Sequence, residues 1–473
     1  MRDTTAWAED EFGHAQLGDA RRTCRLVALA AEIARRPAGT VTKACASSAS
    51  REGAFRFLGN DDVHPDAVAA ATQLRTVERC RAYPRVIVPV DGSSLTLRDE
   101  TGKKDVGGVG AWDKGARGVQ TMTALAVSPD GSTLGVCAQR MWIRSSRSQH
   151  GSNEGATSTS ESRFWLELLL ETHRAFSEDA PGVEPWFQMD RGADIWSVLE
   201  LACALGALLT VRAVYNRPLD GGGRLWTTLE RARLVAKQRI DVPARPPARR
   251  KKRIGGKRVS YSTAPRKARI ATVAIRAATV PLECKTQHGR VLTVTVNAVL
   301  VREQGRRHDD RLEWMLLTTH PIGSRRDVLE VVRAYALRWR VEDFHRAWKR
   351  GLCRVEDTQL RSRNAIFKWA TILGAVATRA MRLTHLARQT PDVLASTELS
   401  SSELQAVVAL RRPKDFDDDD IPKLTLARAV RWIADIGGYT GPWNGPPGAT
   451  VIGRGLYDVL VTARAFEYRD KKR

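Results

Sequence analysis

The chain contains 473 residues, with 76 lysines and arginines against 53 aspartates and glutamates, which gives a formal net charge of +23. Its apolar fraction of 42% and charged fraction of 27% are those of a folded protein, so disorder is excluded as the main state. The excess of positive charge favours a polyanionic partner, most simply nucleic acid, over a small neutral substrate.

Three further classes are disfavoured by local composition. The N-terminal residues are acidic and contain no apolar core, so we expect no signal peptide. No segment approaches the roughly eighteen uninterrupted apolar residues that a membrane span needs. The 7 cysteines are odd in number and spread along the chain without a C-x-x-C pair, which favours a reducing cytoplasm over a disulfide framework or a zinc site.

Residues 1–65 are predicted to be helical. Apolar residues at helical spacing run from Leu26 to Ile33 and stop before Pro37. A second helix is expected to begin near Ser48 or Ser50, either of which could cap its N-terminus. The numbers of acidic and basic residues in this part are equal, so its net charge does not by itself indicate DNA binding.

Residues 66–386 are predicted to be mixed α/β. A continuous apolar run at 86–90 is typical of a buried strand, and the runs at 121–127 and 133–141 flank a Ser-Pro-Asp-Gly turn signal. An amphipathic helix is expected at 164–176, and a long helix at about 326–349. The other expected strands are 186–189, 208–214, 291–301 and 314–318.

The positive charge is concentrated in this middle part, which carries a net +22. Within it, residues 242–282 contain 12 lysines or arginines and no acid, among them Lys251, Lys252 and Arg253. Prolines and glycines in its first half and alternating β-branched residues in its second predict a basic loop that leads into a strand. The segment could be a solubilising insertion, or it could lie along a phosphate backbone.

The predicted helix at 326–349 carries one carboxylate among phosphate-binding side chains. At about 100° per residue, one stripe would hold the side chains of Tyr335, Arg338, Glu342, Arg346 and Lys349. Apolar residues occupy a largely opposed face. A solvated face with ion pairs is the alternative reading, but the four potential phosphate donors around one acid favour a functional site.

A catalytic magnesium ion needs more than one carboxylate among its oxygen ligands. Asp91 and Asp190 are the candidate partners of Glu342, because each is expected at or just after a short apolar strand. Taken alone, an aspartate in such a position is more often a turn or helix-cap residue, and it is the combination with the stripe that favours a metal site.

These motifs together resemble those of the insertion-sequence-family-four transposases. The Y-R-E-K signature of that family is matched by Tyr335, Arg338, Glu342 and Lys349. The segment 339–349 is similar, almost residue for residue, to the corresponding segment in that family. Residues 190–194 look like its D-R-E-A-D box, with Gly192 in place of the glutamate. Segments at 17–22, 52–57 and 432–439 resemble its terminal domains.

The resemblance implies a fold class and a domain order. It implies an α/β ribonuclease-H-like catalytic core with an inserted β-rich segment, flanked by N-terminal and C-terminal helical domains. The corresponding ranges are 1–65 for binding of DNA ends, 66–386 for catalysis with the insertion at about 217–320, and 387–473 for dimerisation.

The resemblance also implies a D-D-E triad of Asp91, Asp190 and Glu342 that holds Mg²⁺, for which Mn²⁺ can substitute, as two ions. Two ions would activate the attacking oxygen and stabilise the leaving oxygen at phosphorus. His345 completes an E-x-x-H pattern that suits a di-metal site; the family's pattern favours a packing or supporting histidine instead.

Further DNA contacts follow from the same resemblance. Tyr335, Arg338 and Lys349 would bind phosphates near the cleaved bond, and Arg346 lies on the same stripe. Trp314 would stack on a flipped base, and Arg212 would lie close to the active site. Without the resemblance, Trp314 reads as a core residue and Arg212 as a residue at a strand edge.

The resulting hypothesis is a cut-and-paste DNA transposase, a metal-dependent nuclease and strand transferase. Its partners would be double-stranded DNA, as terminal inverted repeats and target, and a second copy of itself in a synaptic complex, with no membrane. It would act in a prokaryotic cytoplasm in association with the nucleoid. The alternative is a catalytically silent derivative that binds or blocks the repeat ends.

Overall fold

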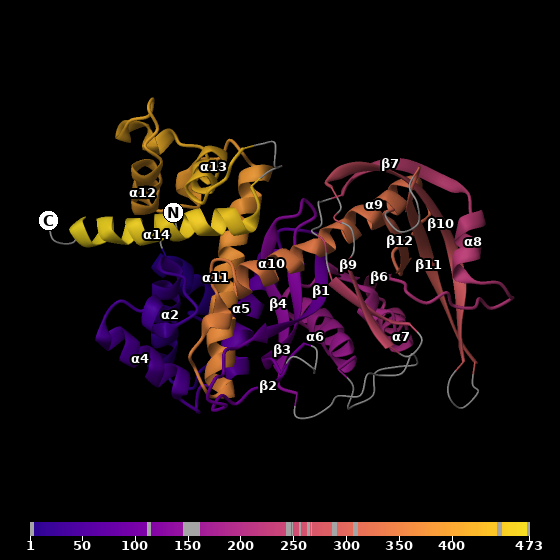
Figure 1. Cartoon of the computed structure of the whole chain (residues 1–473), viewed down its shortest axis with the longest axis horizontal. Coiled ribbons are helices and arrows are strands. Elements are labelled where there is room, and N and C mark those ends of the chain that lie inside the picture. Colours follow the sequence, from indigo (N-terminus) through magenta and orange to yellow (C-terminus); the bar gives the residue numbers. More distant parts are fainter. Residues whose placement is uncertain are drawn as a thin grey trace. The chain divides into compact units, whose positions relative to one another are not determined.

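A computed structural model describes residues 4–110, 115–144, 161–242, 247, 249–254, 257–262, 265, 267–285, 291–305, 311–441 and 447–470. The expected mixed α/β class is confirmed. The chain divides into two compact units (Figure 1). Unit 1 comprises Met1–His150, Thr157–Phe187 and Leu337–Arg473, and unit 2 comprises Gly151–Ala156 and Gln188–Ala336.

The strands all lie in the middle of the chain, with a few helices between them, and the described parts of its ends are helical. The helices are α1 (Thr4–Phe12), α2 (Ala20–Arg35), α3 (Val41–Ala44), α4 (Ser48–Gly59), α5 (Pro65–Cys80), α6 (Arg163–Asp179), α7 (Trp196–Leu205), α8 (Leu225–Arg231), α9 (Arg325–Ala336), α10 (Arg340–Lys349), α11 (Arg363–Gln389), α12 (Ser401–Arg411), α13 (Leu426–Ile436) and α14 (Ala449–Asp470). The strands are β1 (Arg85–Thr96), β2 (Gly107–Gly108), β3 (Arg117–Val127), β4 (Thr133–Trp142), β5 (Glu184–Met189), β6 (Leu208–Arg212), β7 (Leu234–Val242), β8 (Arg249–Ile254), β9 (Lys257–Ser262), β10 (Arg269–Lys285), β11 (Val291–Glu303) and β12 (Glu313–Thr318).

The sheet of unit 1 has β1 beside β3, and β4 pairs with the other edge of β3. Nearly all of β3 is buried, because helices α5, α6, α10 and α11 pack against this sheet. In β1, residues 86–90 are buried, residues 91–94 are at least partly accessible, and Leu95 is buried again. The predicted hairpin at β3 and β4 is therefore confirmed, and β1 carries an aspartate at the point where it leaves the core.

Helix α11 is buried on all sides for most of its length. Its neighbours include α2, α4, α5, α10 and β4. Lys368 is completely buried, and its Nζ donates to the carbonyls of Asn60 and Val63 at 2.8 and 3.0 Å. Burial lowers the pKa of this amine. The indole of Trp369 donates to the Gly39 carbonyl at 2.8 Å, so α11 fastens the N-terminal helices to the sheet.

The N-terminal region is helical, as predicted, and α2 ends at Arg35 before Pro37. The cap of α4 differs from the prediction. Neither Ser48 nor Ser50 caps this helix; the hydroxyl of Ser47 accepts a hydrogen bond from the Ser50 amide at 3.1 Å instead. This places the capping oxygen three residues before the amide that it satisfies, as N-cap geometry requires.

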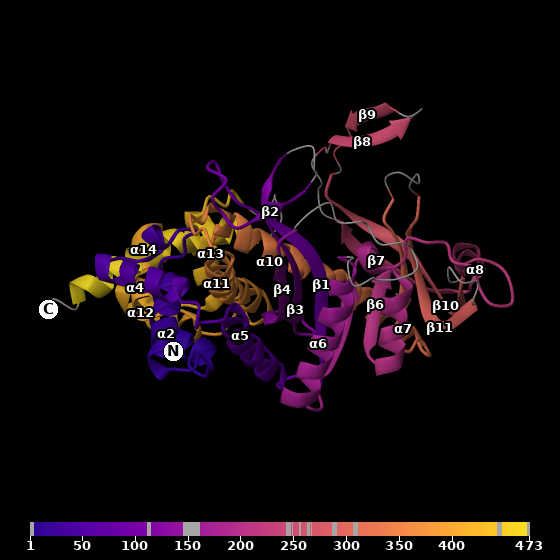
Figure 2. The ribbon, with the colours of Figure 1, turned by 90° about the horizontal axis from the view of Figure 1, so that it is seen from below.

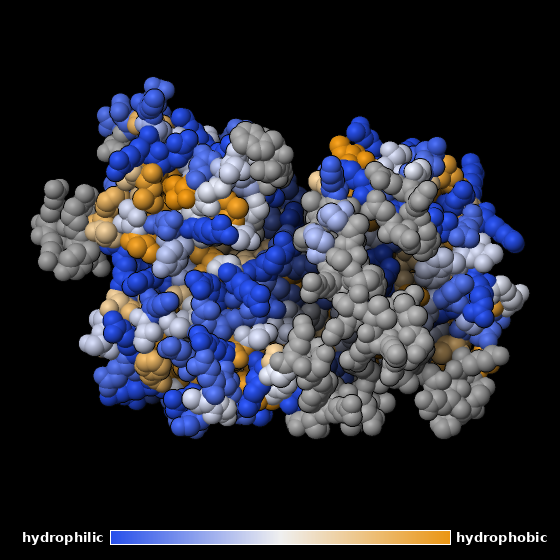
Figure 3. Space-filling view, viewed as in Figure 1, coloured by the Kyte–Doolittle hydropathy of each residue, from blue (hydrophilic) through white to orange (hydrophobic). Residues whose placement is uncertain are grey.

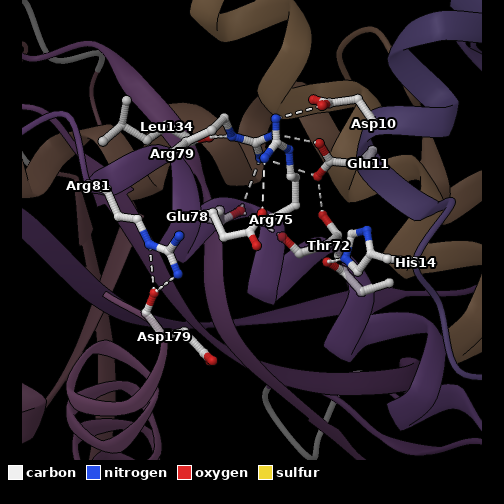
Figure 4. Close-up of polar contacts among 12 residues, drawn as sticks. Asp10, Glu11, His14, Thr72, Arg75, Glu78, Arg79, Arg81, Leu134 and Asp179 are labelled. Carbon is white, nitrogen blue, oxygen red and sulfur yellow. Dashed lines mark hydrogen bonds and ion pairs between the residues drawn. The ribbon is translucent and has the colours of Figure 1, made fainter. Parts of the chain in front are cut away.

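A buried polar network joins α1 to α5 (Figure 4). Arg79 forms an ion pair with the buried Glu11 at 2.6 Å, and the hydroxyl of Thr72 donates to the same carboxylate. Arg75 pairs with Asp10 at 2.6 Å. Because a buried charge is costly unless it is paired, these contacts fix the position of α1 on α5.

Unit 2 contains a meander of antiparallel strands in the order β6-β12-β11-β10-β7. Helix α8 packs on β10 and β11, and α9 packs on β11 and β7. The range 217–320, expected to be β-rich, thus holds six strands and one α-helix among its described residues.

The sequence predicts a basic loop in the first half of 242–282. This prediction is wrong for residues 249–254 and 257–262, which form strands. Strands β8 and β9 form a separate two-stranded antiparallel sheet (Figure 2), in which Lys251, Lys252 and Arg253 are paired with Ser260, Val259 and Arg258. Two glycines separate these strands in the sequence, which is a hairpin signal. The strand expected in the second half is confirmed as β10.

Among the described residues, every helix is too short or too polar to cross a lipid bilayer.

Gly39 provides a test of how tightly the N-terminal region packs against the segment between α10 and α11. A Cβ atom at Gly39 would lie 1.9 Å from the carbonyl oxygen of Arg354, whereas one at Gly59 would meet no atom within 4 Å. We expect Gly39→Ala to lower the free energy of unfolding by about 1–3 kcal/mol because the backbone must shift. The free energy of unfolding of Gly59→Ala should lie within about 1 kcal/mol of that of the parent protein. Urea denaturation of both variants measures these changes in stability, and equal unfolding midpoints for the two variants would contradict the prediction.

Candidate active site

Asp91 and Glu342 lie on one groove of unit 1, although 250 residues separate them in the sequence. Asp91 comes from β1 and Glu342 from α10, which packs against β1 and β3. The strand continues to Thr96, so the expectation that Asp91 lies at or just after the strand end is wrong. Pairing of residues 91–96 with β3 extends β1 beyond its apolar run.

Arg338 joins the two carboxylates. Its Nη2 donates to Glu342 Oε1 at 2.8 Å, and its Nη1 forms an ion pair with Asp91 Oδ2 at 3.5 Å. The side chain of Arg338 is only 13% exposed, so this pairing is shielded from solvent. One guanidinium therefore bridges two converging acids and offsets part of their mutual repulsion, leaving one net negative charge.

The groove has a volume of about 510 Å³ and a basic rim. Arg346, Lys349 and Arg350 line it, together with Ser93 from β1 and Thr450 from the first turn of α14. Burial lowers the pKa of the Lys349 amine, and the nearby carboxylate of Glu356 opposes that shift. A groove with two carboxylates and several cations suits a phosphodiester together with a divalent cation.

His345 lines the same groove but faces the sheet. It is buried, and its Nε2 lies 3.4 Å from the hydroxyl of Thr123 on β3. Burial lowers the pKa of His345 to about 3, so the ring is neutral at pH 7. This location agrees with the expected packing role.

The predicted single helix at 326–349 is interrupted. Helix α9 ends at Ala336, the 3₁₀ turn η3 occupies Leu337–Trp339, and α10 begins at Arg340. Because a 3₁₀ turn has three residues per turn, side chains before and after it do not keep the single stripe of an uninterrupted α-helix. The expected apolar face is confirmed for Val341, Phe344 and Trp348.

Four of the stripe residues stay together in unit 1, while Tyr335 belongs to unit 2. Arg346 is half-exposed, forms an ion pair with Asp343 at 3.2 Å, and places its guanidinium 5.7 Å from the ring centre of Trp339. Burial raises the pKa of Asp343.

Unit 2 holds the other predicted residues. Tyr335 is buried, with its ring centre 5.3 Å from that of Trp314 on β12 in an edge-on arrangement. Arg212, at the end of β6, donates from Nη2 to the Glu313 carbonyl at 2.6 Å. The three expected DNA contacts Arg212, Trp314 and Tyr335 therefore lie on neighbouring parts of this unit.

Asp190 directly follows β5 and caps the short 3₁₀ helix η2 (Arg191–Ala193), accepting a hydrogen bond from the Gly192 amide at 2.7 Å. The boundary between the units falls inside β5, after Phe187, so Asp190 is grouped with unit 2 and the other two acids with unit 1. Within the described residues, no group of three histidine, cysteine or acidic side chains is gathered at one point.

The second acid of the 190–194 box has a different environment. Asp194 is fully buried, and its Oδ2 accepts hydrogen bonds from the amides of Val214 and Tyr215 at 2.6 and 3.1 Å. Its other oxygen pairs with Arg217, which is itself buried. Asp194 therefore fixes the chain after β6.

These environments predict opposite outcomes for the two aspartates of this box. Asp194→Asn leaves Arg217 buried without its counter-charge, so we expect it to lower the free energy of unfolding by about 3–5 kcal/mol. Asp190→Asn keeps a capping oxygen, so it should change stability by less than about 0.5 kcal/mol. Denaturant titrations of the two variants would contradict this assignment if the order of stabilities were reversed.

Comparison with protein families identifies two regions of the chain. The family described as Transposase DNA-binding matches residues 4–63, and the family described as Transposase DDE domain matches residues 83–378, which is more than half of the chain. The second match covers Asp91, Asp190 and Glu342. The protein is therefore a DNA-binding transposase of the DDE family, a family of enzymes that cleave and transfer DNA and depend on a divalent metal.

Proposed function

We propose that this transposase works by cut-and-paste transposition and is a member of the insertion-sequence-family-four group with the Y-R-E-K signature. The observation that carries the proposal is the groove of unit 1, where Arg338 joins Asp91 to Glu342 and where Lys349 and Arg346 form the rim. A site that only bound DNA would have no use for two converging acids at the centre of a basic groove.

In this proposal the core is ribonuclease-H-like, and Asp91, Asp190 and Glu342 hold two Mg²⁺ ions, or Mn²⁺ in their place. Carboxylate oxygens are the ligands that these hard cations prefer, and Asp91 and Glu342 fit because they already share one cationic partner. Asp190 follows Phe187 of unit 1 by three residues, which supports its inclusion. When bound, the ions would lower the pKa of the attacking water or 3′-hydroxyl and stabilise the leaving oxygen.

The protein's own cations would orient the DNA. Arg338 and Lys349 would bind phosphate oxygens beside the cleaved bond, and Arg346 would bind the backbone further along the groove. Tyr335, Trp314 and Arg212 would act from unit 2, with Trp314 stacking on an unpaired base and Arg212 close to the reacting strand. Cleavage and joining can use one site because only the attacking oxygen changes between them.

The remaining parts would recognise the ends and assemble the complex. The helical N-terminal region would bind terminal inverted repeats, and a homodimer would form through the C-terminal helices. Figure 3 shows apolar side chains gathered over the C-terminal helices. On these helices Leu410 of α12 and Val461 of α14 are exposed, which supports a protein contact there. The place of action would be the nucleoid of a prokaryotic cytoplasm.

Substitution of the acids tests the catalytic proposal. With a duplex carrying the inverted repeat that flanks the gene, and with Mg²⁺, we expect the parent protein to give nicked and hairpinned products. Glu342→Gln, Asp91→Asn and Asp190→Asn should each reduce cleavage by about a hundredfold or more, because a lost metal ligand costs several kcal/mol in the transition state.

The control is Glu178→Gln on α6, an exposed acid that pairs with Arg174 and does not line the groove. It should cleave like the parent protein. Binding of the repeat by the parent protein without cleavage would support the catalytically silent alternative.

Salt dependence tests the role of strand β8. Simultaneous replacement of Lys251, Lys252 and Arg253 by Ala should reduce the slope of log affinity against log salt concentration by up to about 2.7, since each phosphate contact contributes roughly 0.9. Preference for the repeat over unrelated DNA should stay unchanged, as expected of backbone contacts. Fluorescence anisotropy at several salt concentrations measures both quantities, and a loss of preference would overturn the assignment.

A further inference from the structure

A carboxylate outside the predicted triad lies beneath the groove. Glu356 belongs to the short 3₁₀ helix η4 (Val355–Asp357), and its side chain is 8% exposed. Its Oε1 accepts a hydrogen bond from the Thr96 amide at 2.9 Å and lies 3.7 Å from the Nζ of Lys349. Its Oε2 accepts from the Nε of Arg350 at 2.7 Å. One buried acid therefore contacts the end of β1 and the last turn of α10.

The turn that carries Glu356 is held rigidly. Arg354, just before it, has a φ of 50°, a left-handed conformation that a residue with a Cβ rarely adopts. The Arg354 carbonyl lies against Gly39, where even a methyl group would not fit. Val355 is completely buried. A strained backbone persists only where its surroundings determine it, so the position of the Glu356 carboxylate is well defined.

Lys349 depends on this acid for its place in the groove. A lysine has four rotatable bonds and normally extends its amine into water. Here the side chain is 22% exposed, and its Nζ lies between the Glu356 carboxylate and the hydroxyl of Ser93, at 3.2 Å from the latter. Ser93 is two residues after Asp91 on β1, and both residues line the groove, so the amine lies beside the strand that carries Asp91.

We propose that Glu356 is a positioning residue that holds the Lys349 amine in the groove, where it meets a phosphate of the bound DNA. Glu356 itself touches no DNA and acts through Lys349. The consequence for cleavage rests on the function proposed above, whereas the placement of Lys349 does not. The competing possibility is that Glu356 only fastens η4 to β1 through the Thr96 amide.

The first experiment measures Lys349 directly. Glu356→Gln keeps an oxygen for the Thr96 amide but removes the charge that holds the ammonium group. We expect pulse acetylation at fixed pH, followed by mass spectrometry of the Lys349 peptide, to show a rise of about threefold or more in the rate of modification, because the amine loses its anionic partner.

The matched control is Glu403→Gln. Glu403 is equally buried and pairs with Arg379, but it lies on α12 outside the groove. Its replacement should leave the acetylation rate of Lys349 unchanged. An unchanged rate in Glu356→Gln as well would overturn the proposal. If circular dichroism shows that Glu356→Gln does not fold, Glu356→Asp takes its place. The shorter side chain keeps its charge but draws the carboxylate back from Nζ of Lys349, so we expect the same rise in the acetylation rate. An unchanged rate in Glu356→Asp would again overturn the proposal.

The second experiment is a double-mutant cycle in the cleavage assay. Glu356→Gln should reduce cleavage of the repeat-end duplex by roughly ten- to a hundredfold, as displacement of an orienting group does. In a Lys349→Met background the same change should cost less than about twofold, because two residues that act as one unit are not additive. Additive losses would show that Glu356 serves only the fold. Absence of cleavage by the parent protein would refute the proposed function, and the acetylation rates would still decide the placement of Lys349.

Discussion

The buried surface of helix α11 is the constraint on which unit 1 depends. This helix is apolar on almost every side, so it must be covered on every side, and the N-terminal helices, the sheet, α10 and the C-terminal helices supply that cover. Lys368 and Trp369 add directional contacts to this packing, because their buried donors must find acceptors and the carbonyls of the N-terminal region provide them. The positions of β1 and α10, and therefore of the site, follow from this assembly.

Placing α10 against β1 brings two acids together, and this arrangement has an electrostatic cost that nearby cations offset. Arg338 offsets it for Asp91 and Glu342, and the pair of Lys349 and Arg350 does the same for Glu356. A groove built in this way is prepared for a polyanion that arrives with cations, which is the chemistry expected of a DDE transposase.

Much of the fold could be predicted from local patterns. The apolar run at 86–90 identifies β1, the Ser-Pro-Asp-Gly signal identifies the β3–β4 hairpin, and the apolar spacing before Pro37 identifies α2 and its end. These features depend on residues that are close together in the sequence, so local sequence patterns are enough to predict them. The break at Leu337–Trp339 carries no such signal, since the residues around it favour a helix; it coincides with the boundary between the two units, which falls after Ala336.

The sequence by itself determined which residues are available for chemistry: the candidate acids Asp91, Asp190 and Glu342, and a positive charge concentrated in the middle of the chain. Only the tertiary structure decided how they are used. It buried Asp194 as a structural acid while Asp190 caps a short turn, it joined Asp91 to Glu342 through Arg338, and it brought Glu356 beneath Lys349. Local patterns cannot specify such pairings, because burial and counter-charge are properties of the packed chain and come from residues far away in the sequence.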